Sequence, residues 1–296
     1  MRGQVPGSSY GVVMSLPTPA RLIAGAAARL AAFPNPRLDA ETLFRGVSGL
    51  DRAAFLSRLD EPVEPGVAAR FDAAVARREH HEPIQYILGV AAFWRDDFIV
   101  SPAVLIPRPD TEILIEAVAA RLRPLFAPRL LDIGTGSGCI ALSLLRELPG
   151  ARAVAVDLSG EALDVARRNA DRLGLGARIA LRRSRWLQAL DPAETFDAIV
   201  SNPPYVARAD EPSLPEEVRG HEPALALFAD ASDDLSSYRA IIGELGDHLD
   251  PSGLLAFEVG AGQSDRVARL LTEAGFGAVE AHNDLARMPR VVIGRR

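Results

Sequence analysis

The sequence contains one cysteine, Cys139, among its 296 residues. A single cysteine forms neither an internal disulfide nor a cysteine-based metal cluster, so a reducing compartment suits this chain. Apolar residues make up 48% of it, yet no run approaches the roughly 20 consecutive apolar residues that span a bilayer. We therefore expect a globular, cytoplasmic protein that does not enter a membrane.

The chain also has fewer basic residues than a nucleic-acid-binding protein usually needs. Lysine and arginine number 33 against 39 acidic residues, which gives a formal net charge of -6. Binding to phosphates needs a dense basic surface, whereas scattered arginines on an acidic chain are usually solvated. We expect no direct nucleic-acid binding. The candidates for a local basic patch are Arg123, Arg129, Arg182, Arg183 and Arg185.

Two familiar kinds of catalytic site are missing. His80, His81 and Glu82 lack both the i, i+4 histidine pair and the third ligand of a zinc site. Ser201 and Ser213 do not stand in the Gly-rich turn that surrounds a nucleophilic serine. The sequence therefore predicts neither a metal centre nor a serine hydrolase.

The first part of the chain, residues 1–88, is predicted to be a small helical bundle. Its first fifteen residues lack the apolar run of a signal peptide, and we expect them to be a disordered leader. Ala, Leu and Arg then recur at helical spacing in 20–32, 39–47 and 67–78. Proline and glycine divide this pattern into helices of about 10 to 14 residues.

Residues 89–109 are expected to form a β-hairpin linker. Val90–Trp94 and Phe98–Val100 are β-prone runs on either side of the polar turn Arg95–Asp97.

Residues 110–296 read as an α/β domain. Short apolar runs alternate there with helical stretches, which predicts a mainly parallel sheet with helices on both faces. The last two runs are separated by a short loop, which suits an antiparallel hairpin at one edge of the sheet. The runs are Arg129–Ile133, Ala153–Asp157, Ala177–Leu181, Phe196–Ser201, Gly253–Glu258, Gly277–Glu280 and Arg290–Ile293.

A glycine-rich turn closes the first of these strands. Gly134, Thr135, Gly136, Ser137 and Gly138 join it to the helix that begins at Cys139. The spacing G-x-G-x-G differs from the G-x-G-x-x-G of dinucleotide sites, which favours a nucleoside-type ligand without pyrophosphate.

Two further residues suit a nucleoside. Asp157 ends the second strand, where a carboxylate can accept hydrogen bonds from both ribose hydroxyls. Trp186 follows the third strand, and its ring is suited either to an adenine face or to the core. Cys139 has no neighbouring base that would activate it, so we interpret it as a small packing residue.

The fourth strand leads directly into Asn202, Pro203, Pro204 and Tyr205. Two prolines stiffen this loop and remove two backbone donors, so it offers mainly acceptors. The Asn202 side-chain oxygen and the Pro203 carbonyl can each accept one N–H of a planar nitrogen, while Tyr205 can stack on its face. This arrangement favours transfer of a methyl group to an amide-type or exocyclic nitrogen.

The motifs together resemble the peptide chain release factor glutamine methyltransferases, in which a Rossmann-like methyltransferase domain follows a small helical domain. The resemblance spans almost the whole chain and rests on Glu82–Gly89, Phe93–Trp94, Ser101–Glu112 and Asn202–Tyr205. The tetrapeptide Asn-Pro-Pro-Tyr alone is shared with adenine-N6 DNA methyltransferases and with several RNA and ribosomal-protein methyltransferases. The run Pro107–Glu112 favours the release factor family among them. The resemblance begins after the leader, which makes Met14 an alternative start.

The resemblance implies methyl transfer from S-adenosylmethionine to the glutamine side chain in the Gly-Gly-Gln loop of a release factor. Asn202–Tyr205 would hold that glutamine, and the helical domain would dock the release factor. The cofactor would be held by Gly134, Thr135, Gly136, Ser137, Gly138, Asp157, Trp186 and Asn202. The family often has an acidic residue before the tryptophan, whereas this chain has Arg185.

Three other functions compete with this interpretation. A ribosomal-protein glutamine or adenine in DNA could receive the methyl group, although the acidic charge and the lack of an obvious target-recognition domain count against DNA. A non-catalytic adaptor that only binds a nucleoside would have no use for the intact Asn202 loop.

We expect Asn202→Ala to abolish turnover while cofactor binding largely survives, because the main role of Asn202 is to orient the nitrogen. Calorimetric titration of the variant with cofactor, beside a rate measurement, checks this. A loss of cofactor affinity as large as the loss of rate would contradict it.

Overall fold

The computed structural model describes residues 16–229 and 233–296. The expected leader over residues 1–15 and the alternative start at Met14 lie outside the described residues. The chain divides into two compact units, Met1–Leu88 and Gly89–Arg296. No helix in the described ranges is long and apolar enough to cross a bilayer.

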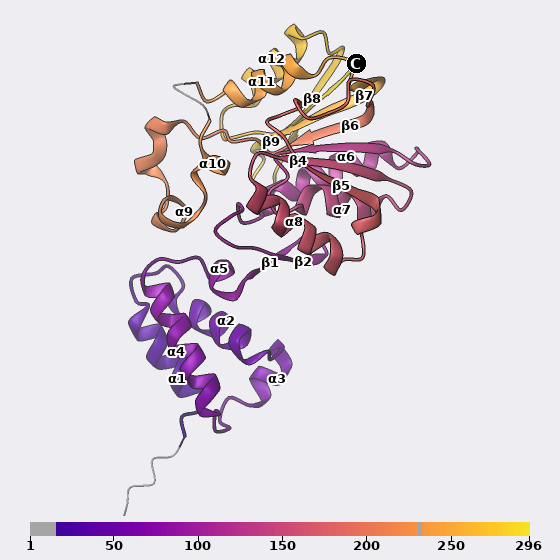
Figure 1. Cartoon of the computed structure of the whole chain (residues 1–296). Helices are drawn as coiled ribbons and strands as arrows, with labels where there is room; N and C mark the ends of the chain where they lie inside the picture. The colour runs from indigo at the N-terminus through magenta and orange to yellow at the C-terminus, as the bar shows by residue number, and fades with distance from the viewer. Residues whose placement is uncertain (1–15, 230–232) are drawn as a thin grey trace, which may run out of the picture. The chain divides into compact units, whose positions relative to one another are not determined.

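The first unit is built from short helices around one apolar core (Figure 1). Leu30, Leu43 and Phe71 lie at its centre, each almost fully buried. Pro36 and Pro65, which the sequence analysis treated as breaks, each begin a helix, because proline has no N–H to lose in the first turn. The helices are α1 (Pro19–Arg29), α2 (Pro36–Ser48), α3 (Arg52–Ser57), α4 (Pro65–Glu79) and α5 (Ile84–Leu88).

The second unit holds a seven-stranded sheet in the order β5-β4-β3-β6-β7-β9-β8. The first five strands in this order are parallel, and β9 and β8 form an antiparallel edge hairpin, which confirms the predicted mainly parallel sheet. The strands are β3 (Arg129–Ile133), β4 (Arg152–Asp157), β5 (Ile179–Arg183), β6 (Phe196–Ser201), β7 (Leu249–Glu258), β8 (Ala278–Asn283) and β9 (Pro289–Arg295).

Helices cover both faces of this sheet (Figure 1). Successive side chains of a strand point to opposite faces, so Leu130 packs with one helix layer and Leu131 with the other. α6 (Glu112–Leu122), α7 (Cys139–Glu147) and α8 (Gly160–Arg172) form the first layer. α11 (Ser236–Glu244) and α12 (Ser264–Glu273) form the second.

Several predicted boundaries were wrong; β7, for example, begins at Leu249 and not at Gly253. β5 begins two residues later than predicted, because residues Gly176–Arg178 form a 3-10 turn before it. In the hairpin of β1 (Val90–Phe93) and β2 (Asp96–Ile99), Trp94 and Arg95 make the turn. Asp96 therefore belongs to a strand, where its carboxylate pairs with Arg146 at 3.0 Å.

One buried asparagine ties this hairpin to the sheet. Asn169 of α8 is fully buried, and its side chain both donates to and accepts from the backbone of Ile99, at 3.0 and 2.7 Å. Its amide also donates to the carbonyl of Ser137, at 2.8 Å, in the loop between β3 and α7. A single side chain thus satisfies three backbone groups from two distant segments.

We expect Asn169→Ala to lower the free energy of unfolding by about 3 kcal/mol, because three buried backbone groups lose their partner. Urea denaturation measures the change. Asn283→Ala, at an exposed position in the edge strand β8, is the matched control and should change stability by less than about 0.5 kcal/mol. Equal effects from both variants would contradict the role given to Asn169.

Candidate active site

The candidate site lies where two neighbouring parallel strands end. Ile133 of β3 lies opposite Ser201 of β6, and the Ser201 hydroxyl donates to the Ile133 carbonyl at 2.7 Å. The glycine loop and the Asn202 loop therefore leave the sheet side by side. Ligands of such sheets bind beyond the carboxyl ends of the strands.

The glycines of the first loop have two different roles. Gly134 and Gly136 have φ of 73° and 54°, and a Cβ added to either would meet no atom within 4 Å. Both glycines leave space beside the backbone, which allows a ligand to approach it closely. Gly138 serves packing, because its Cβ would lie 3.0 Å from Leu142 and 3.3 Å from Ala166.

Two carboxylates hold this loop in place. Asp132 accepts from the Thr135 hydroxyl at 2.6 Å and from the Ala141 N–H at 3.2 Å, and its complete burial raises its pKa to about 7. Asp157 accepts from the N–H groups of Gly136 and Ser159, both at 2.9 Å, and burial again raises its pKa. Asp157 was predicted from the sequence as part of the site, whereas Asp132 was not.

The second loop is fixed by neighbours on three sides. The Asn202 amide nitrogen donates to the Thr111 hydroxyl at 3.5 Å. The carbonyl of Pro204 accepts from the Ser237 hydroxyl at 2.7 Å, and that of Tyr205 accepts from the Gln263 amide at 3.0 Å. Two of the loop carbonyls are thus already engaged within the protein.

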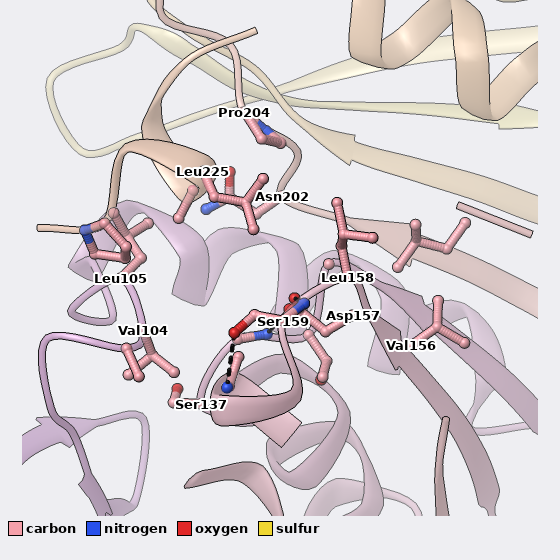
Figure 2. A pocket seen from close by; sticks show the side chains of 18 of the residues that line it. Val104, Leu105, Ser137, Val156, Asp157, Leu158, Ser159, Asn202, Pro204 and Leu225 are labelled. Carbon is pink, nitrogen blue, oxygen red and sulfur yellow. Dashed lines mark hydrogen bonds between the residues drawn. The ribbon is translucent and has the colours of Figure 1, made fainter. Parts of the chain in front are cut away.

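Both loops border one cavity of about 470 Å³ (Figure 2), a volume within the range of small-molecule sites. Eight of the predicted site residues line it: Gly134, Thr135, Gly136, Ser137, Asp157, Trp186, Asn202 and Pro204. Gly138, Pro203 and Tyr205 are not among the described residues that line it. Pro203 is buried beneath the loop, and Tyr205 packs against the core beside α11.

The wall opposite the sheet was missed from the sequence. It is made by the segment Pro102–Arg108 and by residues 223–228 around α10 (Ala224–Leu227). Buried Glu222 joins these two segments, because its carboxylate accepts from the Ile106 N–H at 3.2 Å and pairs with Arg108 at 2.5 Å. The resemblance had picked out Ser101–Glu112 without giving its residues a role.

Trp186 and Cys139 both contact the cavity and the core. Trp186 has a φ of 47°, which is unusual for a bulky residue, and its side chain packs on the cluster beneath β6 and β7 while it borders the cavity. Burial raises the pKa of the Cys139 thiol to about 12. The thiol is therefore neutral, as expected of a packing residue.

Comparison with known proteins gives two family matches. Residues 21–89 match the family described as PrmC N-terminal domain, and residues 109–218 match the one described as methyltransferase small domain. Release factor glutamine methyltransferase of Moorella thermoacetica is 45% identical over 86% of this chain and 87% of its own length. The protein of that name from Koribacter versatilis is 41% identical over 89% of this chain and 92% of its own.

The chain belongs to the release factor glutamine methyltransferase family. The suspected resemblance is thereby confirmed, and it extends over both units of the chain. A methyltransferase structure from Pyrococcus furiosus shares the fold, with a TM-score of 0.51, 18% identity, and coverage of 78% of this chain and 98% of its own.

We expect Arg108→Met to lower the free energy of unfolding by about 3 kcal/mol, because it leaves the Glu222 side chain, only 1% exposed, without its cation. Thermal unfolding measures the loss. Arg37→Met is the matched control: that arginine is 80% exposed in its pair with Glu41, and we expect a change below about 0.5 kcal/mol. If both variants cost the same, the Glu222 pair does not hold the wall.

Proposed function

We propose that this chain transfers a methyl group from S-adenosylmethionine to the side-chain amide nitrogen of the glutamine in the Gly-Gly-Gln loop of a peptide chain release factor. Family membership supports the substrate class. The observation that carries the chemistry is that Asn202 and the glycine loop border the same cavity. This shared cavity supports an acceptor for a planar nitrogen close to a nucleoside site.

The residues at the glycine end fit the nucleoside part of the cofactor. Gly134 and Gly136 leave space beside the backbone, and Asp157 lies at the end of β4 with its carboxylate already oriented by two N–H groups. Carboxylate oxygens have spare lone pairs, so Asp157 can also accept from ribose hydroxyls. Trp186 and Leu158 supply apolar surface for the base. The cofactor, when bound, supplies the electrophilic methyl group.

Asn202 would orient the nitrogen. With its own amide nitrogen turned to Thr111, its side-chain oxygen is the atom available to accept a substrate N–H. Pro203 does not itself line the cavity, but its carbonyl would accept the second N–H if the substrate amide reaches the loop backbone, whereas the Pro204 carbonyl is engaged by Ser237. Holding the reacting atoms in line can supply about 7 kcal/mol or more of the barrier, so no strong base is needed. Tyr205 would support the loop from the core side.

Adenine in DNA is the weaker candidate, because several arginines of the possible basic patch are already paired. Arg182 binds Glu194 at 2.6 Å, and Arg123 lies 3.5 Å from Glu147. The guanidinium of Arg183 donates to the Leu158 carbonyl at 3.0 Å. The charges of Arg182 and Arg123 are thus balanced by carboxylates of the protein, which leaves less positive charge for phosphates.

The helical unit would bind the body of the release factor. This role rests on the family match over residues 21–89, because a helical bundle by itself is compatible with many functions. The hairpin and the sheet unit would then receive only the glutamine loop.

A labelled-methyl assay tests the proposal, with release factor, ribosomal protein and DNA offered in parallel. We expect label in the release factor alone, and none when its Gly-Gly-Gln glutamine is replaced by asparagine, because the shorter side chain keeps its nitrogen from the donor. Label in DNA or ribosomal protein instead, or in no substrate, would overturn the proposal.

A further inference from the structure

An ionisable residue stands at the end of a buried apolar run. Glu258 is the last residue of β7, follows four fully or almost fully buried apolar residues, and is itself 2% exposed. Its carboxylate accepts from the Thr111 hydroxyl at 2.5 Å, across 147 positions of sequence. Burying an ionisable group is costly, so its presence here needs a reason beyond packing.

The geometry links this carboxylate to Asn202 in two ways, through the Thr111 hydroxyl and by a hydrogen bond of the Asn202 side chain itself. The Thr111 oxygen lies 2.5 Å from Glu258 and 3.5 Å from the Asn202 amide nitrogen. A hydroxyl has one proton to donate and lone pairs to accept with, and an ionised carboxylate can only accept. The Thr111 proton must therefore go to Glu258, and the oxygen of Thr111 is left to accept.

The direction of the Thr111 hydrogen bond determines the orientation of the Asn202 amide. If Thr111 can only accept on that side, it must receive the NH₂ group, and the amide oxygen must point the other way. The reversed amide would present N–H donors to a substrate nitrogen that also carries N–H donors. Such an arrangement repels the substrate instead of orienting it.

We propose that Glu258 and Thr111 are positioning residues, whose hydrogen-bond chain holds the Asn202 amide with its oxygen toward the substrate. The inference rests on the proposed function for the identity of that substrate. The chain of contacts itself, from β7 through the turn Pro109–Thr111 to the end of β6, does not depend on it.

The surroundings of Glu258 make the chain sensitive to pH. Burial is the main cause that raises the pKa of this carboxyl to about 7, the hydrogen bonds of Thr111 and Asn202 oppose it, Asp110 raises it and Arg290 lowers it. Tyr205, Tyr238 and Cys139 also interact with this carboxylate. Once protonated, Glu258 can donate to Thr111, and the polarity is no longer fixed. We expect kcat to fall as the pH drops through this pKa.

Substitutions test the chain through kcat, KM and cofactor affinity. We expect Thr111→Val, which removes only the hydroxyl, and Glu258→Gln, whose amide can donate as well as accept, each to lower kcat by at least about tenfold. Cofactor affinity should change by less than about threefold, since the hydrogen bonds of Thr111 and Glu258 do not involve Asp157 or the glycine loop. Thr111→Ser restores the hydroxyl and should recover most of the rate.

The controls and the pH profile separate positioning from general damage. Thr272→Val and Glu273→Gln make the same changes at exposed positions of α12 and should leave kcat as in the wild type. The acid limb of kcat, measured from about pH 5.5 to about pH 8.5, should disappear in Glu258→Gln. The double variant should be no slower than the slower single one, because one chain is broken in either case.

A readout without turnover keeps this inference distinct from the proposed function. Carbon NMR of the Glu258 carboxyl follows its titration, and Thr111→Val should raise that pKa because the charged form loses a donor. Failure of the wild type to methylate any release factor would overturn the proposed function alone. An unmoved Glu258 pKa in Thr111→Val, or variants with unchanged kcat and pH profile, would overturn the positioning chain.

Discussion

The parallel pairing of β3 with β6 is the constraint on which the site depends. It sets Ile133 beside Ser201, and the hydroxyl of Ser201 reinforces the pairing at its last rung. Because β4 lies on the other side of β3, Asp157 arrives at the same edge. Strand order therefore sets both ends of the cavity, which we propose hold the nucleoside and the substrate nitrogen.

Buried carboxylates hold the loops and side chains that the sheet brings to the cavity. Asp132 shapes the glycine loop, Glu222 joins the two segments of the outer wall, and Glu258 reaches Asn202 through Thr111. Each is costly to bury and each accepts hydrogen bonds from groups that would otherwise be free to turn. The carboxylates that are most costly to bury thus lie where they orient the loops and side chains of the cavity.

Local pattern predicted most of the fold. Short apolar strands bounded by turns gave the sheet, and the positions of Gly134, Asp157 and Asn202 at strand ends led to one edge of it. Such features are readable because each depends on neighbours within a few residues. The starts of α2 and α4 at Pro36 and Pro65 were misjudged for the opposite reason: whether a proline ends a helix or starts one depends on the residues that follow.

Local sequence patterns could not predict the cavity wall made by Pro102–Arg108 and residues 223–228. They also could not predict the hydrogen bonds that link Glu258, Thr111 and Asn202. Glu222 and Arg108 are 114 positions apart, and residues 223–228 have neither a helical nor a strand period to mark them. The sequence did contain one indication of the buried contact of Glu258. Glu258 follows a run of apolar residues in its strand, and a carboxylate in that setting predicts a buried partner.

The neutral state of Cys139 bears on chemical selectivity. A thiolate is a far stronger nucleophile than an amide nitrogen, and this residue borders the cavity proposed to hold a methyl donor. Burial, with Asp132 and Glu258 nearby, keeps the sulfur protonated. With the proposed donor bound, a neutral sulfur would be a poor acceptor for its methyl group, so the substrate amide would not compete with a thiolate.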